Sequence, residues 1–454
     1  MSNEREALVA IIGEPNVGKS TLMNKLVEAR IALTSSVAGT TRDRFYAPAT
    51  WNAVDFSLID TAGIILEQRD ELEKNIQKQV EIAISEADLI LYVLDGKKPA
   101  DSINRNIMLK LRKQKKDVLL VINKIDSPKK FVEMVSEYSF TGFKNIFPIS
   151  AVSGMGTGDL LDGITDSLKK QGFGQIEKDP STISVAILGK PNVGKSSLFN
   201  KIIGEERVVV SSVPGTTRNV VDTDITYKGH KIKFLDTAGL KRKDKNQPLP
   251  DIYAALQTIR AMRKADVCLF MIDASESISQ QDQRIAGEIV EASKGFVLVA
   301  NKIDLLAPKK KEKLFSQLPD YFPFLWWAPA VPISAKDGEG VKEVLDYILT
   351  IEVNRKKEID SQTLKDFFYA KQKIRQPQRL RDERVPKVYS LQQTSTNPPV
   401  FLMMVNEPSA ISMQFRKFIQ NSIMKELGFW GTPIILKLQA KRGNPKFNEK
   451  MVNY

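Results

Sequence analysis

Apolar runs that end at a glycine occur at two places in the chain, and a helical pattern follows each. Residues 7–12 and 183–188 are rich in β-branched side chains and lead into Gly13 and Gly189, as expected of buried parallel strands that feed a loop. The apolar residues downstream recur at helical spacing: Leu22, Met23 and Leu26 in the first place, Leu198, Phe199 and Ile202 in the second. The pattern therefore predicts a strand, a loop and a helix, twice.

The duplication continues downstream. Motifs near the two loops match at an offset of 176 residues, as 13 does to 189, and the apolar strands 89–95 and 267–273 match at 178. Strands that alternate with helices predict the α/β class, here two doubly wound, mostly parallel sheets with ligand groups at the carboxyl ends of strands. We assign the first domain to residues 1–170 and the second to 182–354. Residues 171–181 contain glycines and a proline and suit a mobile linker.

Residues 355–454 follow another pattern and predict a third, small α+β domain of order α-β-β-α-β. A helix is expected at 363–374 with Leu364, Phe367 and Phe368 inward, and strands at 387–394 and 399–406. A second helix is expected at 409–427, ending at Gly428. A last strand at 432–439 places Ile434, Leu436 and Leu438 on one face, against Ile435, Lys437 and Gln439 on the other.

Composition narrows the class of protein. The 454 residues are 42% hydrophobic and 27% charged, which suits two or three soluble globular domains. The net charge is +13, and residues 351–454 hold 19 Lys and Arg against 9 Asp and Glu. The third domain therefore suits a polyanion, although a solvated basic surface is the alternative. No apolar stretch approaches the ~20 residues that span a bilayer, and the chain starts directly into a strand, so we expect a cytoplasmic protein.

Two residue types are too rare for several kinds of chemistry. Cys268 is the only cysteine and lies in an apolar run, so we expect a buried structural thiol. His230 is the only histidine. A histidine-based triad or a histidine-rich metal site is therefore excluded.

The glycine-ended loops have the form GxxxxGK[ST]. Glycines allow backbone N–H groups to wrap phosphates, the lysine supplies positive charge, and the hydroxyl binds Mg²⁺. The residues expected to bind phosphate are Gly13, Asn16, Val17, Gly18, Lys19, Ser20 and Thr21 in the first copy, and Gly189, Asn192, Val193, Gly194, Lys195, Ser196 and Ser197 in the second.

Asp-Thr-Ala-Gly follows an apolar strand in both copies, which indicates a switch that responds to a γ-phosphate. We expect Asp60 and Asp236 to hold Mg²⁺ with Ser20 and Ser196, and the amides of Gly63 and Gly239 to face the γ-phosphate. Gly-Thr-Thr-Arg supplies the other Mg²⁺ ligand. We favour Thr41 and Thr217, with Thr40 and Thr216 as alternatives. Catalysis is expected to depend on Lys19, Thr41, Gly63, Lys195, Thr217 and Gly239.

Asn-Lys-Ile-Asp follows a later strand in both copies and predicts guanine as the base. A carboxylate can pair with the ring N–H and amino group of guanine, donors that adenine lacks. Asn123 and Asn301 should bond the opposite base edge or neighbouring loops, and the amides of the later Ser-Ala motif should reach the guanine oxygen. The expected base-binding residues are Asn123, Lys124, Asp126, Ser150 and Ala151, and Asn301, Lys302, Asp304, Ser334 and Ala335.

The water-orienting glutamine of many G proteins is replaced by Ile64 and Leu240. Hydrolysis must then rely on loops that position water and on positive charge at the phosphates. Asn16 and Asn192 could hold a monovalent cation there, whereas the simpler interpretation is that Asn after Pro makes the turn.

Two consecutive Gly-x-Pro-Asn-Val-Gly-Lys-Ser domains, followed by a basic domain containing Asn397-Pro-Pro-Val-Phe-Leu-Met-Met-Val-Asn406 and Gly431-Thr-Pro-Ile434, resemble the Der (EngA) family of GTPases over essentially the whole chain. The resemblance implies a KH-like third domain and GTP hydrolysis to GDP with Mg²⁺, stimulated by K⁺ bound at Asn16 and Asn192. It also implies that the partners are the large ribosomal subunit and its precursors, both rRNA and ribosomal proteins. We expect a monomer that acts in large-subunit maturation. The alternative is a ribosome- or RNA-binding scaffold in which one G domain is mainly structural.

The sequence departs from the family pattern at Glu14, where a basic residue is common. Gly428-Phe-Trp-Gly431 has the GxxG spacing of nucleic-acid-binding KH domains, but it follows the last helix, so we interpret it as a helix cap and turn. The third domain is thus suited to bind protein or a G domain as well as RNA.

The two copies also differ after the Asp-Thr-Ala-Gly motif. Residues 240–245 are basic where 64–68 are apolar and acidic. We hypothesise that Lys241, Arg242 and Lys243 read rRNA or dock the third domain.

Overall fold

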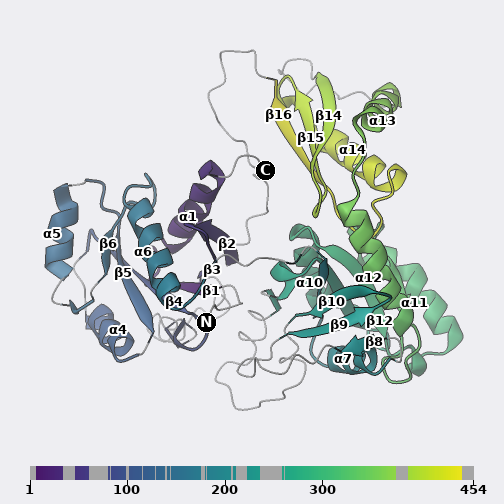
Figure 1. Cartoon of the computed structure of the whole chain (residues 1–454), viewed down its shortest axis with the longest axis horizontal. Coiled ribbons are helices and arrows are strands. Elements are labelled where there is room, and N and C mark those ends of the chain that lie inside the picture. Colours follow the sequence, from purple (N-terminus) through teal and green to yellow (C-terminus); the bar gives the residue numbers. More distant parts are fainter. Residues whose placement is uncertain are drawn as a thin grey trace. The chain divides into compact units, whose positions relative to one another are not determined.

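The computed structural model divides the chain into two compact units, residues 1–178 and 179–454, whose elements are labelled in Figure 1. Each unit is described by itself. The structure describes residues 7–33, 46–60, 80–81, 83–98, 102–114, 116–127, 129–138, 141–143, 145–174, 179, 181–205, 208–210, 222–235, 258–259, 261–374 and 387–441.

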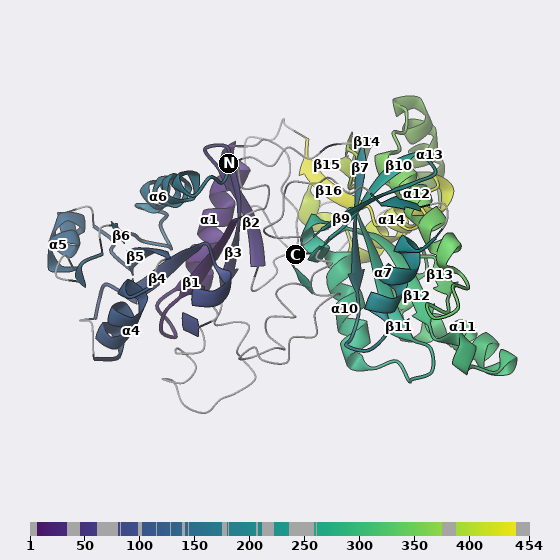
Figure 2. The ribbon, with the colours of Figure 1, turned by 60° about the horizontal axis from the view of Figure 1, so that its bottom comes forward.

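The first unit contains a six-stranded sheet of order β2-β3-β1-β4-β5-β6, in which β2 alone is antiparallel to its neighbour. The strands are β1 (Ala7–Ile12), β2 (Tyr46–Trp51), β3 (Val54–Asp60), β4 (Leu89–Asp95), β5 (Asp117–Asn123) and β6 (Ile146–Pro148). The named helices are α1 (Lys19–Leu33), α4 (Ser102–Arg112), α5 (Lys129–Tyr138) and α6 (Thr157–Lys170). Apolar side chains of α1 and α6 share one core with a face of the sheet, and α4 lies across the sheet from α6 (Figure 2).

The second unit begins with a seven-stranded sheet of order β13-β12-β11-β7-β10-β9-β8, in which β9 runs antiparallel to both of its neighbours, β8 and β10. Its strands are β7 (Thr182–Leu188), β8 (Val208–Val210), β9 (Thr223–Tyr227), β10 (His230–Phe234), β11 (Val267–Asp273), β12 (Gly295–Asn301) and β13 (Ala330–Pro332). Its helices are α7 (Lys195–Ile203), α10 (Gln280–Glu291), α11 (Pro308–Tyr321) and α12 (Val341–Lys356). The expected doubly wound, mostly parallel sheets are confirmed. Leu198, Phe199 and Ile202 are fully buried, and Cys268 is a buried thiol, as predicted.

The same unit ends in the third domain, which consists of α13 (Ser361–Ile374), β14 (Val388–Ser395), β15 (Val400–Val405), α14 (Met413–Glu426) and β16 (Ile435–Ala440). The predicted order α-β-β-α-β is confirmed, as are the inward positions of Leu364, Phe367 and Phe368. The predicted start of the second helix at 409 is wrong. A 3-10 turn occupies Pro408–Ala410, and Ser412 caps α14 by accepting the backbone N–H of Phe415.

One hydrophobic core runs from the second α/β domain into the third domain. It includes Phe296 and Trp327 of the former and Phe401 and Phe429 of the latter, with ring centroids 6.2 Å apart in the first pair and 5.6 Å in the second. Because the two domains share a core, they form one compact unit. Throughout the described part of the chain, no helix combines the length and apolar character needed to cross a membrane.

Candidate functional site

The two phosphate loops have the same backbone conformation. Gly13 and Gly189 have φ of 152° and 145°, and an added Cβ would lie 2.4 Å from the carbonyl oxygen of Val93 and 2.3 Å from that of Met271. Each loop is thus folded tightly against the neighbouring strand, and only glycine fits at its start.

The second glycine of each loop lies against the asparagine of the base motif. A Cβ at Gly18 or Gly194 would lie 2.4 or 2.2 Å from Nδ2 of Asn123 or Asn301. The loop and the end of β5 or β12 therefore touch in both copies. This contact joins the phosphate side of the site to the base side.

The loop lysine is directed back at its own loop in both copies. Lys19 Nζ donates to the carbonyl oxygens of Gly13 at 2.9 Å and Glu14 at 2.7 Å, and Lys195 Nζ donates to those of Gly189 at 2.8 Å and Lys190 at 2.6 Å. Burial lowers the pKa of Lys19, while Asp60 and Glu14 oppose that shift. Burial lowers the pKa of Lys195 to about 8. A buried ammonium group that points into the loop is ready to meet a phosphate.

The residue after the first loop glycine distinguishes the two copies. In the first copy Glu14 Oε1 accepts Nδ2 of Asn104, on α4, at 2.8 Å. In the second copy Lys190 Nζ forms an ion pair with Asp282 Oδ2, on α10, at 2.8 Å. Glu14 stands out in the sequence but its partner does not, and the matching offset of 178 between Asn104 and Asp282, equal to that of the preceding strands, is the signal that could have identified both partners. The two loops therefore carry different charge beside the same phosphate cradle.

A hydroxyl and a carboxylate meet at the end of β3. Ser20 Oγ donates to Asp60 Oδ2 at 2.7 Å, and Asp60 is 2% exposed. Oxygen donors placed together at a phosphate loop fit Mg²⁺, which prefers such ligands and takes the rest from phosphates and water. The first part of the predicted metal site is thus brought together. In the second copy Ser196 is placed at the start of α7.

Several predicted residues lie outside the described residues. They are Thr40, Thr41, Gly63, Ile64, Thr216, Thr217, Asp236, Gly239, Leu240 and the basic segment at 241–245, together with parts of the linker at 171–181. Their assigned roles stay predictions.

The asparagine of the base motif bridges two loops. Asn123 Nδ2 donates to Val17 O at 2.7 Å, and its Oδ1 accepts the N–H of Ala151 at 2.9 Å. Asn301 repeats both bonds at 2.7 and 2.9 Å, to Val193 and Ala335. Of the two expectations for these asparagines, the structure shows bonding to neighbouring loops. The alanine amides donate to these side chains, so a guanine oxygen would share those donors.

The lysine of the base motif is held by an aspartate that the sequence analysis did not single out as functional. Lys124 and Lys302 have φ of 70° and 68°, and their ammonium groups bond Asp95 Oδ2 at 2.7 Å and Asp273 Oδ2 at 2.5 Å. Burial alone would raise the pKa of each aspartate, but the lysine hydrogen bond and backbone N–H donors reverse the effect and lower it. The recurrence of aspartate at the ends of the matched strands β4 and β11 was the signal that could have identified them.

The base-reading carboxylates have different surroundings in the two copies. Asp126 accepts Ser150 Oγ at 2.9 Å and pairs with Lys97 at 3.1 Å, and hydrogen bonds from both lower its pKa. Asp304 is exposed, and Ser334 Oγ donates to Asp337 Oδ2 at 2.8 Å. Both aspartates are thus exposed at the carboxyl end of the sheet.

The loop asparagines Asn16 and Asn192 are exposed and have φ of 63° and 66°. This left-handed conformation accounts for asparagine after proline as a turn residue. Asn16 also contributes its carbonyl oxygen to Lys124 Nζ at 2.6 Å. Both asparagines thus occupy turn positions, and the role as cation ligand stays a prediction.

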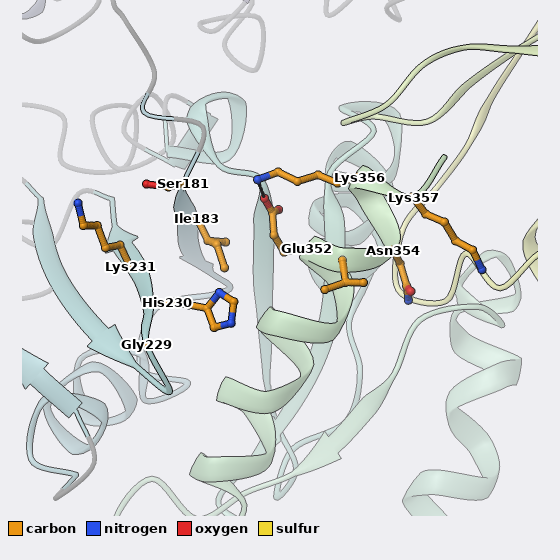
Figure 3. Close-up of a pocket in the computed structure, with 10 residues that line it drawn as sticks. Ser181, Ile183, Gly229, His230, Lys231, Glu352, Asn354, Lys356 and Lys357 are labelled. Carbon is orange, nitrogen blue, oxygen red and sulfur yellow. Dashed lines mark ion pairs between the residues drawn. The ribbon is translucent and has the colours of Figure 1, made fainter. Parts of the chain in front are cut away.

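A separate hollow of about 750 Å³ lies at the opposite ends of the strands in the second unit. Figure 3 shows Ile183 of β7, His230 and Lys231 of β10, and Glu352 of α12 around it, with Glu352 paired to Lys356 at 2.7 Å. Ile183 lies at the amino end of β7, and His230 and Lys231 lie at the amino end of β10. The hollow is therefore not part of the nucleotide site.

Each α/β domain thus carries a phosphate loop, a lysine, and a base motif at the carboxyl ends of its strands, and this combination defines a tandem P-loop GTPase. A family described as 50S ribosome-binding GTPase matches residues 8–124 and again 184–302. A family described as KH-domain-like of EngA bacterial GTPase enzymes, C-terminal, matches residues 358–439.

Full-length relatives agree with these domain matches. The chain is 39% identical to GTPase Der of Halothermothrix orenii over 440 residues, covering 96% of this chain and 99% of the relative. It is 37% identical to GTPase Der of Chloroflexus aggregans over 443 residues, covering 96% and 98%. A solved structure of Aquifex aeolicus Era is 24% identical, covers 57% of this chain and 93% of Era, and has a TM-score of 0.29. The chain belongs to the Der (EngA) family of GTPases, and its third domain is the KH-like domain of that family.

Proposed function

We propose that this GTPase acts as a two-site switch in maturation of the large ribosomal subunit. The observation that carries the proposal is the presence of two equivalent nucleotide sites, each in a domain matching a family described as 50S ribosome-binding GTPase. The basic character of residues 351–454, with 19 Lys and Arg against 9 Asp and Glu, supports a polyanionic partner. The proposed partners are the large subunit and its precursors, through rRNA and ribosomal proteins, and the proposed working form is a cytoplasmic monomer.

The residues proposed to hold GTP come from the loop geometry and from the repeated motifs. Backbone N–H groups of the loops at 13–21 and 189–197 would surround the phosphates, while Lys19 and Lys195 would exchange their bonds to loop carbonyls for phosphate oxygens. Ser20, Asp60 and Thr41, with Ser196, Asp236 and Thr217 in the second copy, would hold Mg²⁺. When bound, Mg²⁺ neutralises phosphate charge.

Base recognition would come from carboxylates at the edge of each sheet. Asp126 and Asp304 would accept the ring N–H and amino group of guanine, and the stems of Lys124 and Lys302 would cover the ring. The bridging asparagines would keep the phosphate loop and the base loop in register. An ATP molecule would leave the carboxylate unpaired, which opposes its binding.

Hydrolysis is proposed to use the amides of Gly63 and Gly239 at the γ-phosphate, with K⁺ held by Asn16 and Asn192 in place of a catalytic side chain. GTP turnover in potassium and in sodium at equal ionic strength tests this proposal. We expect faster turnover in potassium, and we expect Asn16→Ala together with Asn192→Ala to remove the difference. Equal turnover in both salts would rule out the cation site.

Copurification with ribosomal particles tests the ribosomal role. We expect wild-type protein to sediment with large-subunit particles in a non-hydrolysable GTP analogue and to a different extent in GDP. Lys19→Ala and Lys195→Ala, which remove the phosphate cation in one site each, should change that dependence. Sedimentation that is absent in both nucleotides would contradict the proposal, and sedimentation independent of nucleotide and of both lysines would favour the scaffold alternative.

A further inference from the structure

A groove of about 650 Å³ lies between α14 and the segment that follows α11, within the second unit. Trp326 lines one side, and Lys417, Phe418, Asn421 and Lys425 line the other. Along α14, Lys417 and Phe418 lie four and three residues before Asn421, and Lys425 lies four after it, so these residues share one helix face. Figure 1 shows α14 in yellow beside the end of α12. The groove is built from both the second G domain and the KH-like domain.

Trp326, which lines the groove, contacts a second exposed indole, that of Trp430. The residue exposure is 40% at Trp326 and 50% at Trp430. Their ring centroids are 6.2 Å apart, with the ring planes at 76°. Neighbouring large aromatic side chains that remain in water are uncommon on a folded surface and mark binding sites.

The backbone at Trp430 is fixed by hydrogen bonds. The Trp430 carbonyl accepts Asn354 Nδ2 at 2.8 Å, and the next residue, Gly431, donates to Trp327 O at 2.9 Å and accepts the N–H of Phe296 at 2.8 Å. Gly431 has φ of 74°, and a Cβ there would lie 2.3 Å from the Ile351 side chain. The Gly-Phe-Trp-Gly turn is therefore clamped to the second G domain. The backbone from which the Trp430 side chain projects is thus fixed before any ligand binds.

The charge of the groove is positive. Lys417 and Lys425 are exposed on α14, and the acidic residue that lines the groove, Glu426, is paired with Lys371 of α13. Asn421 and Gln414 add side-chain amides on the same helix face. Flat aromatic faces, ammonium groups and amides are the groups that bind bases, phosphates and base edges of an unpaired nucleic acid strand.

We propose that this groove binds single-stranded RNA. Bases stack on Trp326 and Trp430, Lys417 and Lys425 contact the phosphates, and Asn421 contacts a base edge. A duplex is disfavoured because its stacked bases hide the faces that the indoles would cover. The proposal rests on the proposed ribosomal role, for which it names the surface that contacts rRNA.

The test uses the full-length protein and a fluorescein-labelled single-stranded RNA of about ten nucleotides, a length matched to stacking sites on other folds. Anisotropy gives the affinity, and quenching of tryptophan fluorescence reports stacking. We expect Trp326→Ala and Trp430→Ala each to weaken binding by about tenfold or more, and Trp326→Phe to retain much of it. A plot of the logarithm of RNA affinity against the logarithm of salt concentration has a negative slope, and Lys417→Glu should reduce the magnitude of that slope by about 0.7.

Matched controls separate the groove from general surface effects. Tyr369→Ala removes an exposed aromatic of α13, and Lys309→Glu reverses an exposed charge of α11. Neither residue lines the groove. Both variants should bind the RNA as the wild type does, and GTP turnover without RNA should be unchanged in every groove variant.

Three results would overturn the proposal: no RNA binding by the wild type, equal binding by the tryptophan variants, or binding without fluorescence quenching. If the tryptophan variants lose binding to ribosomal particles although the wild type has no affinity for the RNA, the groove contacts a protein and the RNA assignment is wrong. If these variants bind particles normally and the RNA does not bind, the groove proposal fails while the ribosomal role stands. A wild type that binds no particle at all defeats the ribosomal role instead.

Discussion

Replacing Asn301 with alanine should break the connection between the phosphate loop and the base loop of the second site. Asn301 is 3% exposed and makes two buried hydrogen bonds, to Val193 O at 2.7 Å and from Ala335 N at 2.9 Å. Each bond contributes about 0.5–1.5 kcal/mol net, and each buried group left without a partner costs about 1–3 kcal/mol. A loss of about 2–4 kcal/mol is expected after partial relaxation, equal to about 30-fold to about 1,000-fold in nucleotide affinity.

The assay is titration with a fluorescent GDP analogue in a Lys19→Ala background, so that the second site dominates the signal. Asn301→Asp is the informative companion, because a carboxylate still accepts the Ala335 N–H but cannot donate to Val193 O. Its loss should lie between those of wild type and Asn301→Ala. Asn123→Ala in a Lys195→Ala background should give a similar loss, since its two bonds have the same lengths. A folded Asn301→Ala variant that binds within about threefold of its parent would refute the bridging role.

Three further predictions concern charge. Glu14→Gln keeps the acceptor for Asn104 and removes a negative charge beside the phosphates. The GTP affinity of the first site, measured in a Lys195→Ala background, should therefore rise about threefold to tenfold at low salt. An unchanged affinity would contradict this prediction. Burial lowers the pKa of Lys195 to about 8, and a bound phosphate favours the charged amine. GTP binding at higher pH should therefore take up a proton, and the affinity should weaken as pH rises. Calorimetry in two buffers of different ionisation enthalpy detects the proton uptake, and its absence would count against this prediction. Arg355 is 2% exposed and donates to Ser293, Asn397 and Thr432. In urea denaturation, Arg355→Leu should lower the free energy of unfolding of the second unit by about 3–5 kcal/mol, and Arg355→Lys should lower it by less.

The repeated motifs were predictable because their chemistry is local. Each motif reflects a backbone or side-chain requirement that acts within a few residues. These motifs are the glycines at 13, 18, 189 and 194, the loop lysines and the two Asn-Lys-Ile-Asp sequences. Apolar runs likewise predicted the central strands and the buried faces of α7 and α13. These features do not depend on what lies elsewhere in the fold.

Pairings between distant segments were not predictable in the same way. Asn104 and Asp282 lie about 90 residues from their partners in the loops, and no local pattern joins them. The recurrence of Asp95 and Asp273 at the ends of the matched strands marks them in the sequence, but their partners, Lys124 and Lys302, appear only when β4 and β11 are placed beside the base motifs. Likewise, the 3-10 turn before α14 follows from the Ser412 cap, which competes with helix propensity upstream.

Steady-state GTP turnover by Lys19→Ala, Lys195→Ala and the double variant tests the central claim, that both sites are working nucleotide sites. Each lysine is held against its own loop by equivalent bonds, so each single variant should lose a large and comparable part of the turnover, and the double variant should lose nearly all of it. Loss of all turnover from one single variant, with no loss from the other, would show that one G domain is structural and would contradict the account.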